Sequence, residues 1–136
     1  MEKGGKGGNL IWRRRMENLS KSVLVVDDDQ GILDSFEVLL GDQYHLLKAE
    51  NGHEALHILE TDTPQLMFLD IKMPGISGMD VLRKLKIDRK RVDVVVITAS
   101  SQEGIEEEAK SLGAIDYLKK PFDIFDVERI TSQYLN

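Results

Sequence analysis

The sequence predicts an α/β domain in which helices cover both faces of a parallel five-stranded sheet. From Ser22 onward, short runs of β-branched and aliphatic residues alternate strictly with longer amphipathic segments. Most of the short runs are continuously apolar, which is typical of strands buried on both faces. Strict alternation of strands and helices indicates a doubly wound sheet. A chain of 136 residues, 41% of them hydrophobic, is about one domain with its own core.

Each strand is predicted at an apolar run, and each helix at a segment whose apolar residues recur three and four positions apart. The strands are predicted at residues 23–26, 44–47, 65–69, 92–97 and 114–118. The helices are predicted at residues 31–40, 51–60, 78–87, 102–112 and 123–135. The strand order predicted for the sheet is 2-1-3-4-5, one of the common orders of doubly wound folds.

Capping residues support several of these helix boundaries. Ser77 is followed three residues later by Asp80, and Asp123 by Asp126, so that each pair matches the capping box of a helix start. Asp29 is predicted to form a turn or to cap the first helix. Two glycines stand where helices are predicted to stop, Gly41 and Gly113.

Charge is distributed unevenly along the chain. Residues 1–21 hold six basic and two acidic residues, a net charge of +4, whereas residues 22–136 hold 12 basic and 22 acidic residues, a net charge of −10. The acidic part is a poor candidate for direct nucleic-acid binding, which relies on Lys and Arg to neutralise phosphates. Some of its acidity is predicted to be structural, because Glu103 and residues 106–108 crowd a helix start, where the helix dipole favours negative charge.

Residues 1–21 are predicted to form a flexible basic leader before a domain at residues 22–136. The first nine residues are rich in glycine and lack periodicity. The apolar stretch at residues 10–12 is far too short for a signal-peptide core or a membrane span. The chain has no Cys, which excludes a disulfide framework and suits a reducing compartment. We therefore expect a cytoplasmic protein that does not enter a membrane.

Side chains that can react or bind ions lie where the predicted strands end. Asp27 and Asp28 follow the first strand, Asp70 follows the third, Thr98 follows the fourth, and Lys120 comes shortly after the fifth. In the order 2-1-3-4-5 the first, third and fourth strand ends are neighbours, and ligands of open parallel sheets bind at these ends. Carboxylates about 4 to 5 Å apart repel by several kcal/mol, so they need a cation or raised pKa values. A hard divalent ion such as Mg²⁺ fits oxygen ligands of this type.

These residues lie in motifs that resemble those of response regulator receiver domains. The resemblance rests on VVDDD at residues 25–29, LDIKMPG at 69–75, ITA at 97–99 and KPF at 120–122. It runs from about Ser22 to Leu135, with the motifs in order and at the intervals typical of that family, and leaves the leader outside. The resemblance implies a flavodoxin-like (βα)5 three-layer sandwich and a place in a two-component phosphorelay.

The resemblance also implies a role for each residue at the strand ends. Asp70 is implied to be the nucleophile that takes a phosphoryl group from a phosphohistidine, forming an acyl phosphate. The implied direct ligands of Mg²⁺ are Asp28, Asp70 and the backbone carbonyl of Lys72. Asp27 is implied to act on the ion largely through ordered water. Thr98 and Lys120 are implied to bind the remaining phosphoryl oxygens. A cis peptide bond is implied before Pro121.

Three further residues are implied to tune or transmit the signal. Tyr117 occupies the position of a switch aromatic in receivers, on the face made by the helix at residues 102–112, the last strand and the last helix. Lys72 and Ser100, each two residues beyond a site residue, occupy positions that tune the phosphoryl lifetime. The implied partners are a sensor histidine kinase or phosphotransfer protein, and a downstream effector or a second copy docking on that face.

Other interpretations remain open. The string from His53 to His57 matches the metalloprotease pattern H-E-x-x-H, but the apolar stripe of its helix places both histidines on the solvent side. No histidine follows His57, so a third zinc ligand would have to be a carboxylate. A haloacid-dehalogenase-like phosphatase also uses an Asp nucleophile, but it needs a carboxylate where Lys72 stands. A nucleotide-binding domain needs a glycine-rich loop in place of the aspartates after the first strand.

A degenerate receiver that acts only as a binding module is the remaining alternative, although no active-site position is lost. We expect self-directed phosphotransfer and slow autohydrolysis, without turnover of an external substrate. The basic stretch at residues 83–91 is read as a solvated helix end, with partner docking as the alternative. The sequence leaves open whether the chain is a stand-alone receiver or a piece of a longer regulator.

Overall fold

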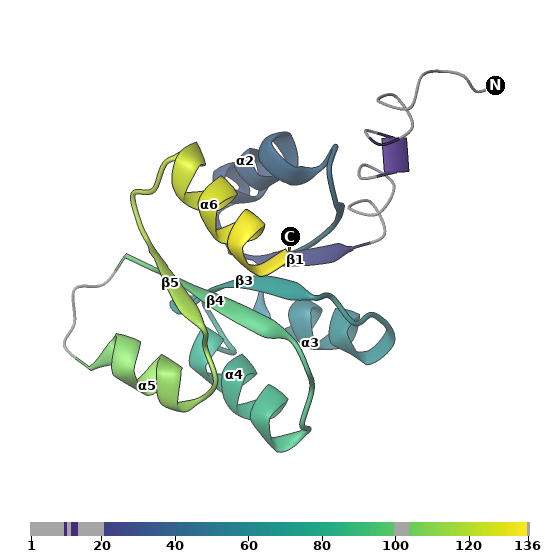
Figure 1. The fold of residues 1–136 in the computed structure, drawn as a ribbon. Helices are drawn as coiled ribbons and strands as arrows, with labels where there is room; N and C mark the ends of the chain where they lie inside the picture. The colour runs from purple at the N-terminus through teal and green to yellow at the C-terminus, as the bar shows by residue number, and fades with distance from the viewer. Residues whose placement is uncertain (1–9, 11, 14–20, 100–103, 136) are drawn as a thin grey trace.

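A computed structural model describes residues 10, 12, 13, 21–99 and 104–135 of the chain. Most of the predicted leader and the lifetime-tuning position Ser100 therefore lie outside the described residues. The rest forms three layers, with a twisted sheet between two layers of helices (Figure 1).

The sheet has five parallel strands in the order β2-β1-β3-β4-β5, which confirms the predicted fold class and strand order. The strands are β1 (Ser22–Val26), β2 (His45–Ala49), β3 (Leu66–Asp70), β4 (Asp93–Thr98) and β5 (Asp116–Lys119). Val26 of β1 is in register with Leu69 of β3, and Asp70 is in register with Ile97 of β4. The carboxyl ends of β1, β3 and β4 therefore meet at one edge of the sheet.

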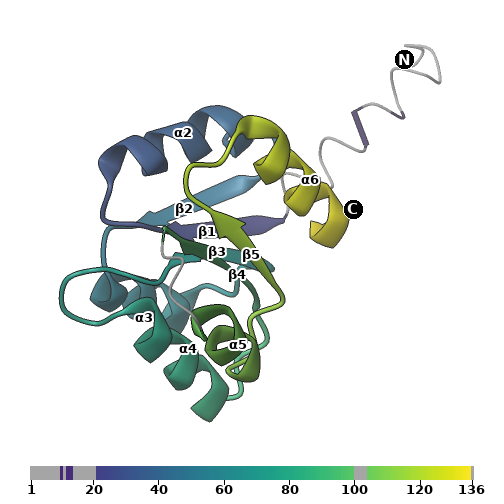
Figure 2. The same ribbon diagram turned by 90° about the vertical axis from the view of Figure 1, so that its left-hand side faces the viewer.

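Five helices cover the sheet, and they divide it into two hydrophobic cores. One face is covered by α2 (Gln30–Leu40) and α6 (Ile124–Leu135), and the other by α3 (Gly52–Thr61), α4 (Gly78–Ile87) and α5 (Ile105–Ser111) (Figure 2). Alternate residues of β1 serve the two cores, since Val23 packs with the first layer and Leu24 with the second. This two-sided burial explains why the strands are apolar without interruption.

The predicted caps are present. Ser77 and Asp80 form a capping box at the start of α4, and Asp123 and Asp126 exchange the same pair of hydrogen bonds before α6. Asp29 caps α2 by accepting a hydrogen bond from the backbone N–H of Gly31 at 2.8 Å. The C-cap of α2 is Gly41, and Gly113, with φ of 108°, follows the end of α5.

Most elements match their predicted bounds to within one residue, whereas α5, β2 and β5 differ by more, β5 starting at Asp116 rather than at residue 114. The helix predicted from residue 102 begins at Ile105, after Gly104 with φ of 91°; residues 100–103, which include Glu103, are outside the described part. The second strand extends through Lys48 and Ala49, which pair with β1. Lys48 is tolerated there because β2 is an edge strand and the ammonium pairs with Glu37 at 2.9 Å.

Much of the basic stretch at residues 83–91 is used inside the domain. Lys90 Nζ donates to the carbonyl of Leu59 in the last turn of α3 at 2.9 Å, and Lys86 Nζ to that of Ser111 at the end of α5 at 3.0 Å. Free carbonyls at helix ends attract cations, so these lysines stabilise neighbouring helices. None of the helices in the described ranges has the length and apolar character needed to cross a bilayer.

Arg83 of the same stretch links two helices. Its guanidinium contacts Asp80 Oδ1 of α4 at 3.0 Å and Glu108 Oε2 of α5 at 2.8 Å. The two contacts share one side chain and orient α5 relative to α4. The arginine therefore serves as a bridge within the domain.

Candidate functional site

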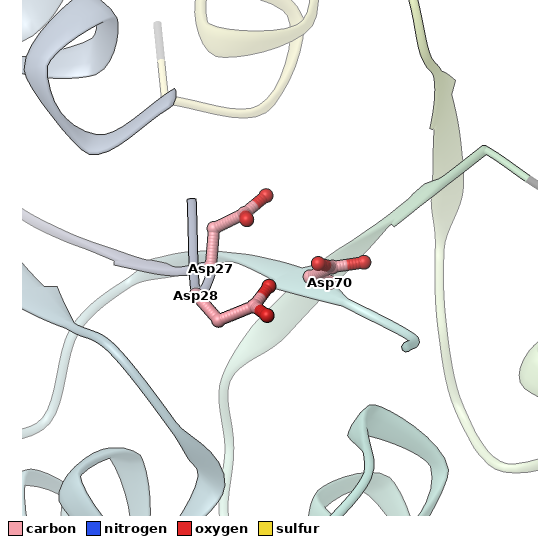
Figure 3. Close-up of side chains that lie close together, drawn as sticks. All are labelled: Asp27, Asp28 and Asp70. Carbon is pink, nitrogen blue, oxygen red and sulfur yellow. The ribbon is translucent and has the colours of Figure 1, made fainter. Parts of the chain in front are cut away.

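Three carboxylates converge where β1 and β3 end. One carboxylate oxygen from each of Asp27, Asp28 and Asp70 lies within 4.8 Å of the others, and Figure 3 shows the three side chains gathered at this edge. Asp27 and Asp70 are buried, whereas Asp28 is exposed. The parallel pairing of β1 with β3 creates this cluster, because it brings residues 43 positions apart to adjacent strand ends.

Asp27 has an exposed fraction of 0%, and its two oxygens have different surroundings. Oδ1 accepts a hydrogen bond from the backbone N–H of Asp29 at 2.9 Å. Oδ2 lies 3.1 Å from Lys120 Nζ as an ion pair, but no donor among the described residues meets it with the geometry of a hydrogen bond. A buried carboxylate oxygen in this state has capacity for a further cationic partner.

Asp70 is held by two weaker contacts. Its Oδ1 accepts a hydrogen bond from the backbone N–H of Lys72 at 3.3 Å, and its Oδ2 accepts one from Lys120 Nζ at 3.5 Å. Burial raises the pKa of the Asp70 carboxyl to about 6, and the negative charge of Asp27 adds to this rise. The Lys120 ammonium and the Lys72 N–H offset only part of this rise, so the ionised form of the Asp70 carboxyl is kept in an unfavourable state.

Lys120 is the cation placed between two of the carboxylates. Its Nζ contacts both Asp27 Oδ2 and Asp70 Oδ2. Partial burial alone lowers the pKa of the Lys120 ammonium, but the close contact with Asp27 and the negative charges of Asp70 and Asp27 outweigh burial and raise it. Its backbone N–H donates to the carbonyl of Thr98 at 2.9 Å, and the peptide bond to Pro121 is cis, as predicted.

Thr98 ends β4 and is buried at the same edge of the sheet. Asp70 is in register with Ile97, the residue before Thr98, which places the threonine on the strand beside the predicted nucleophile. Ala99, which follows it, is exposed and small. The fold thus brings the strand ends that carry Asp27, Asp70 and Thr98 together, as their positions in the sequence predict.

The sequence analysis missed one residue that positions the backbone of Asp70. A Cβ atom at Gly78 would lie 2.2 Å from the carbonyl oxygen of Asp70 and 2.8 Å from the Cα atom of Ile71. The start of α4 therefore packs directly on the backbone of Asp70, which only glycine allows. The backbone N–H of Gly78 also donates to the carbonyl of Ile71 at 2.9 Å. A glycine directly after the capping residue Ser77 was the only signal of this contact in the sequence.

The donor set fits a hard divalent cation. Three carboxylates share the site with one ammonium group, so the described residues leave it with an excess of negative charge. All the available donors are oxygens, and one of them is the buried Asp27 Oδ2. These are the ligands that Mg²⁺ prefers. Asp27, Asp28 and Asp70 are the residues able to hold such an ion.

Tyr117 lies on β5, and its side chain contacts α5. The ring is half-buried in the core beneath α3, α4 and α5, and its hydroxyl donates to the carbonyl of Glu106 at 2.8 Å. Burial and the nearby negative charges of Glu106, Asp116 and Glu107 raise the pKa of the Tyr117 phenol. The predicted switch residue therefore connects β5 to the first turn of α5.

The zinc-protease interpretation finds no assembled site. His53 and His57 are both exposed on α3. Within the ranges that the structure describes, Asp27, Asp28 and Asp70 are the only group of three or more candidate ligands close enough to share an ion. Glu54, the base of the pattern, has Oε1 engaged by the backbone N–H of Glu50 at 2.8 Å.

Comparison with known proteins supports the resemblance. The family model of the response regulator receiver domain matches residues 23–131. Sporulation initiation phosphotransferase F of Bacillus subtilis is 34% identical over 118 residues, which cover 86% of this chain and 95% of that protein. The DNA-binding transcriptional regulator NtrC of Salmonella typhimurium is 39% identical over 117 residues, covering 82% of this chain but 25% of the relative. The chain thus spans nearly all of one relative and about a quarter of the other.

Solved structures give the same result. A response regulator receiver domain protein from Clostridium thermocellum superposes with a TM-score of 0.77 and 30% identity, covering 86% of this chain and 95% of that one. A CheY-like response regulator receiver domain protein from Methanospirillum hungatei has a TM-score of 0.77 and 29% identity, covering 84% and 93%. The similarity therefore extends over almost the whole of each receiver.

The raised pKa of Asp70 predicts a stability that falls with pH when divalent cations are absent. A carboxyl whose pKa is about 6 when folded and 3.8 when exposed binds its proton more tightly in the folded state. The free energy of unfolding therefore decreases as pH rises from about 4 to about 6, by roughly 1 to 3 kcal/mol once solvent screening is allowed for. Asp70→Asn removes this loss and is more stable than wild type at pH 7.5.

The measurement is urea unfolding in a chelator at pH 4.5 and pH 7.5. Asp42→Asn, a change of an exposed aspartate, is the matched control and keeps the wild-type pH dependence. Equal pH dependence in Asp70→Asn and wild type would show that Asp70 is not destabilised by its surroundings.

Proposed function

Because this chain belongs to the response regulator receiver domain family of two-component systems, we propose that it is a phosphoacceptor whose nucleophile is Asp70. The observation that carries the proposal is the cluster of Asp27, Asp28 and Asp70 with Lys120 in contact with two of the three. A structural role does not require two buried carboxylates side by side, whereas phosphoryl transfer at a metal site does.

The reaction proposed for Asp70 is attack of a carboxylate oxygen on the phosphorus atom of a phosphohistidine. A phosphorus–oxygen bond forms, the phosphorus–nitrogen bond breaks, and its electron pair returns to the imidazole of the donor. Hydrolysis later reverses the modification when water attacks the phosphorus atom and the Asp70 carboxylate leaves. The donor is a sensor histidine kinase or a phosphotransfer protein.

Mg²⁺ would be held by Asp28, Asp70 and the backbone carbonyl of Lys72, with Asp27 acting largely through ordered water. When bound, the ion supplies charge neutralisation between the nucleophile and the phosphoryl oxygens. The Lys120 ammonium is already directed at Asp70 and binds a phosphoryl oxygen after transfer. The Thr98 hydroxyl binds another, from the neighbouring strand end. Positioning and charge stabilisation are what this reaction mainly requires of a protein.

Receivers are generally not turnover enzymes, and we assign this chain only its own phosphorylation and slow dephosphorylation. Lys72 is exposed and lies two residues beyond Asp70, beside the path of an attacking water. Its side chain lengthens the phosphoryl lifetime by crowding this path. Ser100, the second tuning position, follows Thr98 by two residues.

The proposed output surface consists of α5, β5 and α6. Phosphorylation draws the Thr98 hydroxyl towards the phosphoryl group, and Tyr117 turns inward, which releases its bond to Glu106 of α5. The surface then binds a downstream effector or a second copy of the chain, in the cytoplasm and without direct contact with nucleic acid or membrane. Residues 22–136 form the receiver, and the basic residues 1–21 precede it.

Incubation with acetyl phosphate and Mg²⁺ tests the proposal through intact mass. Wild type is expected to gain one phosphoryl group because Asp70, the ion and Lys120 are sufficient for transfer from a small donor. Asp70→Asn and chelator-treated wild type are expected to gain none, whereas the control Asp42→Asn behaves as wild type. A wild-type protein that forms no adduct with acetyl phosphate or a phosphohistidine donor would support the degenerate binding module.

The decay of the phosphorylated protein tests the role of Lys72. Lys72→Asn is expected to lose its phosphoryl group several-fold faster than wild type, because a shorter side chain opens the path of water. The readout is the phosphorylated fraction by mass over time after removal of donor. Lys110→Asn, the same exchange on exposed α5, is the matched control. Decay of Lys72→Asn at or below the wild-type rate contradicts the proposed crowding.

Amide chemical shifts of residues 105–111 test the switch. Phosphorylation is expected to shift these signals in wild type, and Tyr117→Ala is expected to lose most of the shift because the link from β5 to α5 is gone. Tyr134→Ala is the control, since this tyrosine bonds Asp116 and leaves Glu106 untouched. Equal shifts in Tyr117→Ala and wild type, at equal phosphorylation, would remove Tyr117 from the switch.

A further inference from the structure

A second group of metal-ligand side chains lies on α3, and the proposed phosphotransfer makes no use of it. His53 and His57 are both exposed on this helix, on the layer of α3, α4 and α5 (Figure 2). The opposite stripe of the helix packs into the core through Ala55 and Leu59. The two imidazoles are therefore directed to solvent, where a metal ion can reach them.

The backbone of α3 holds the two histidines one turn apart. Asn51 caps the helix by accepting a hydrogen bond from the backbone N–H of Glu54 at 2.9 Å, so the first turn that contains His53 is well formed. Residues four apart on a helix lie on one face with their Cβ atoms about 5 to 6 Å apart. Two imidazole nitrogens at this spacing can bind one ion, as in the helical H-E-x-x-H pattern.

Glu60 adds a third group to the same stripe. It lies three residues after His57, and its Oε1 is 3.7 Å from His57 Nδ1. The distance is longer than a hydrogen bond, so the carboxylate contributes its negative charge beside the two imidazoles. A nearby negative charge favours a bound cation.

We propose that His53 and His57 bind a divalent transition-metal ion such as Zn²⁺, with the charge of Glu60 favouring the ion and water completing the coordination. Imidazole nitrogen suits Zn²⁺, Ni²⁺ and Cu²⁺, whereas the all-oxygen cluster of Asp27, Asp28 and Asp70 suits Mg²⁺. The two sites therefore differ in the class of ion that they select. The α3 site is a binding site without hydrolytic chemistry, because Glu54 is engaged by the Glu50 N–H.

Calorimetric titration of untagged protein with Zn²⁺ tests the inference, with Mg²⁺ in large excess to occupy the aspartate cluster. Wild type is expected to bind one Zn²⁺ per chain, or one per two chains if the open coordination positions recruit a second copy. His53→Gln and His57→Gln are each expected to weaken binding at least 10-fold, and Glu60→Gln a few-fold. The chain has three histidines, and the third, exposed His45 on β2, gives the matched control His45→Gln.

Thermal unfolding provides a second readout. An ion that binds only the folded state raises the unfolding temperature. Zn²⁺ is therefore expected to raise the unfolding temperature of wild type and His45→Gln, but not that of the double variant that combines His53→Gln and His57→Gln. Asp70→Asn is expected to bind Zn²⁺ as wild type does, which separates this test from phosphorylation. The inference is overturned if wild type does not bind Zn²⁺, if the double variant keeps wild-type affinity, or if His45→Gln or Asp70→Asn loses it.

Discussion

Asp27 and Asp70 are both buried, and an oxygen of each lies within 4.8 Å of the other and of Asp28. Like charges at this separation in a partly dry site repel, and one ammonium group, that of Lys120, does not balance them. Burial raises the pKa of the Asp70 carboxyl, and the negative charge of Asp27 raises it further. Such an arrangement lowers stability in the isolated domain and becomes favourable when a cation or a phosphoryl group with its metal is bound, so the local instability is directly connected to the proposed chemistry.

The parallel sheet makes this arrangement possible. All five strands run in one direction, so every carboxyl end lies at one edge, and the order β2-β1-β3-β4-β5 places the ends of β1, β3 and β4 side by side. Helix α4 then fixes the backbone of Asp70, because Gly78 packs on its carbonyl and the capping box of Ser77 holds the helix start. Asp70, the proposed nucleophile, is therefore positioned by the strand and by the start of α4, which suits a reaction that depends on orientation.

The strands, the helices and the polar residues that follow each strand were predictable because each depends on local pattern. The strand order, which joins strands distant in the sequence, followed from the common orders of doubly wound sheets and the resemblance to receiver domains. Strands buried on both faces are apolar throughout, and caps such as Ser77 mark helix starts. Features that depend on distant contacts were not predictable. Lys90 stabilises the end of α3 through Leu59, 31 residues away, and Gly78 contacts Asp70 only once α4 has docked. The left-handed Gly104 likewise moves the start of α5 to Ile105.

Helix α5 combines weak packing with polar anchors at both ends. Among its seven residues only Ala109 is fully buried, and the helix is held by the Tyr117 hydroxyl on Glu106, by Arg83 on Glu108 and by Lys86 on Ser111. Exposed ion pairs contribute about 0 to 1 kcal/mol each, and a hydrogen bond about 1. A coupling free energy of about 1 to 3 kcal/mol is typical between linked sites. The contact through Tyr117 is thus comparable in free energy to such a coupling, which is consistent with the proposed displacement of α5 when the site changes charge.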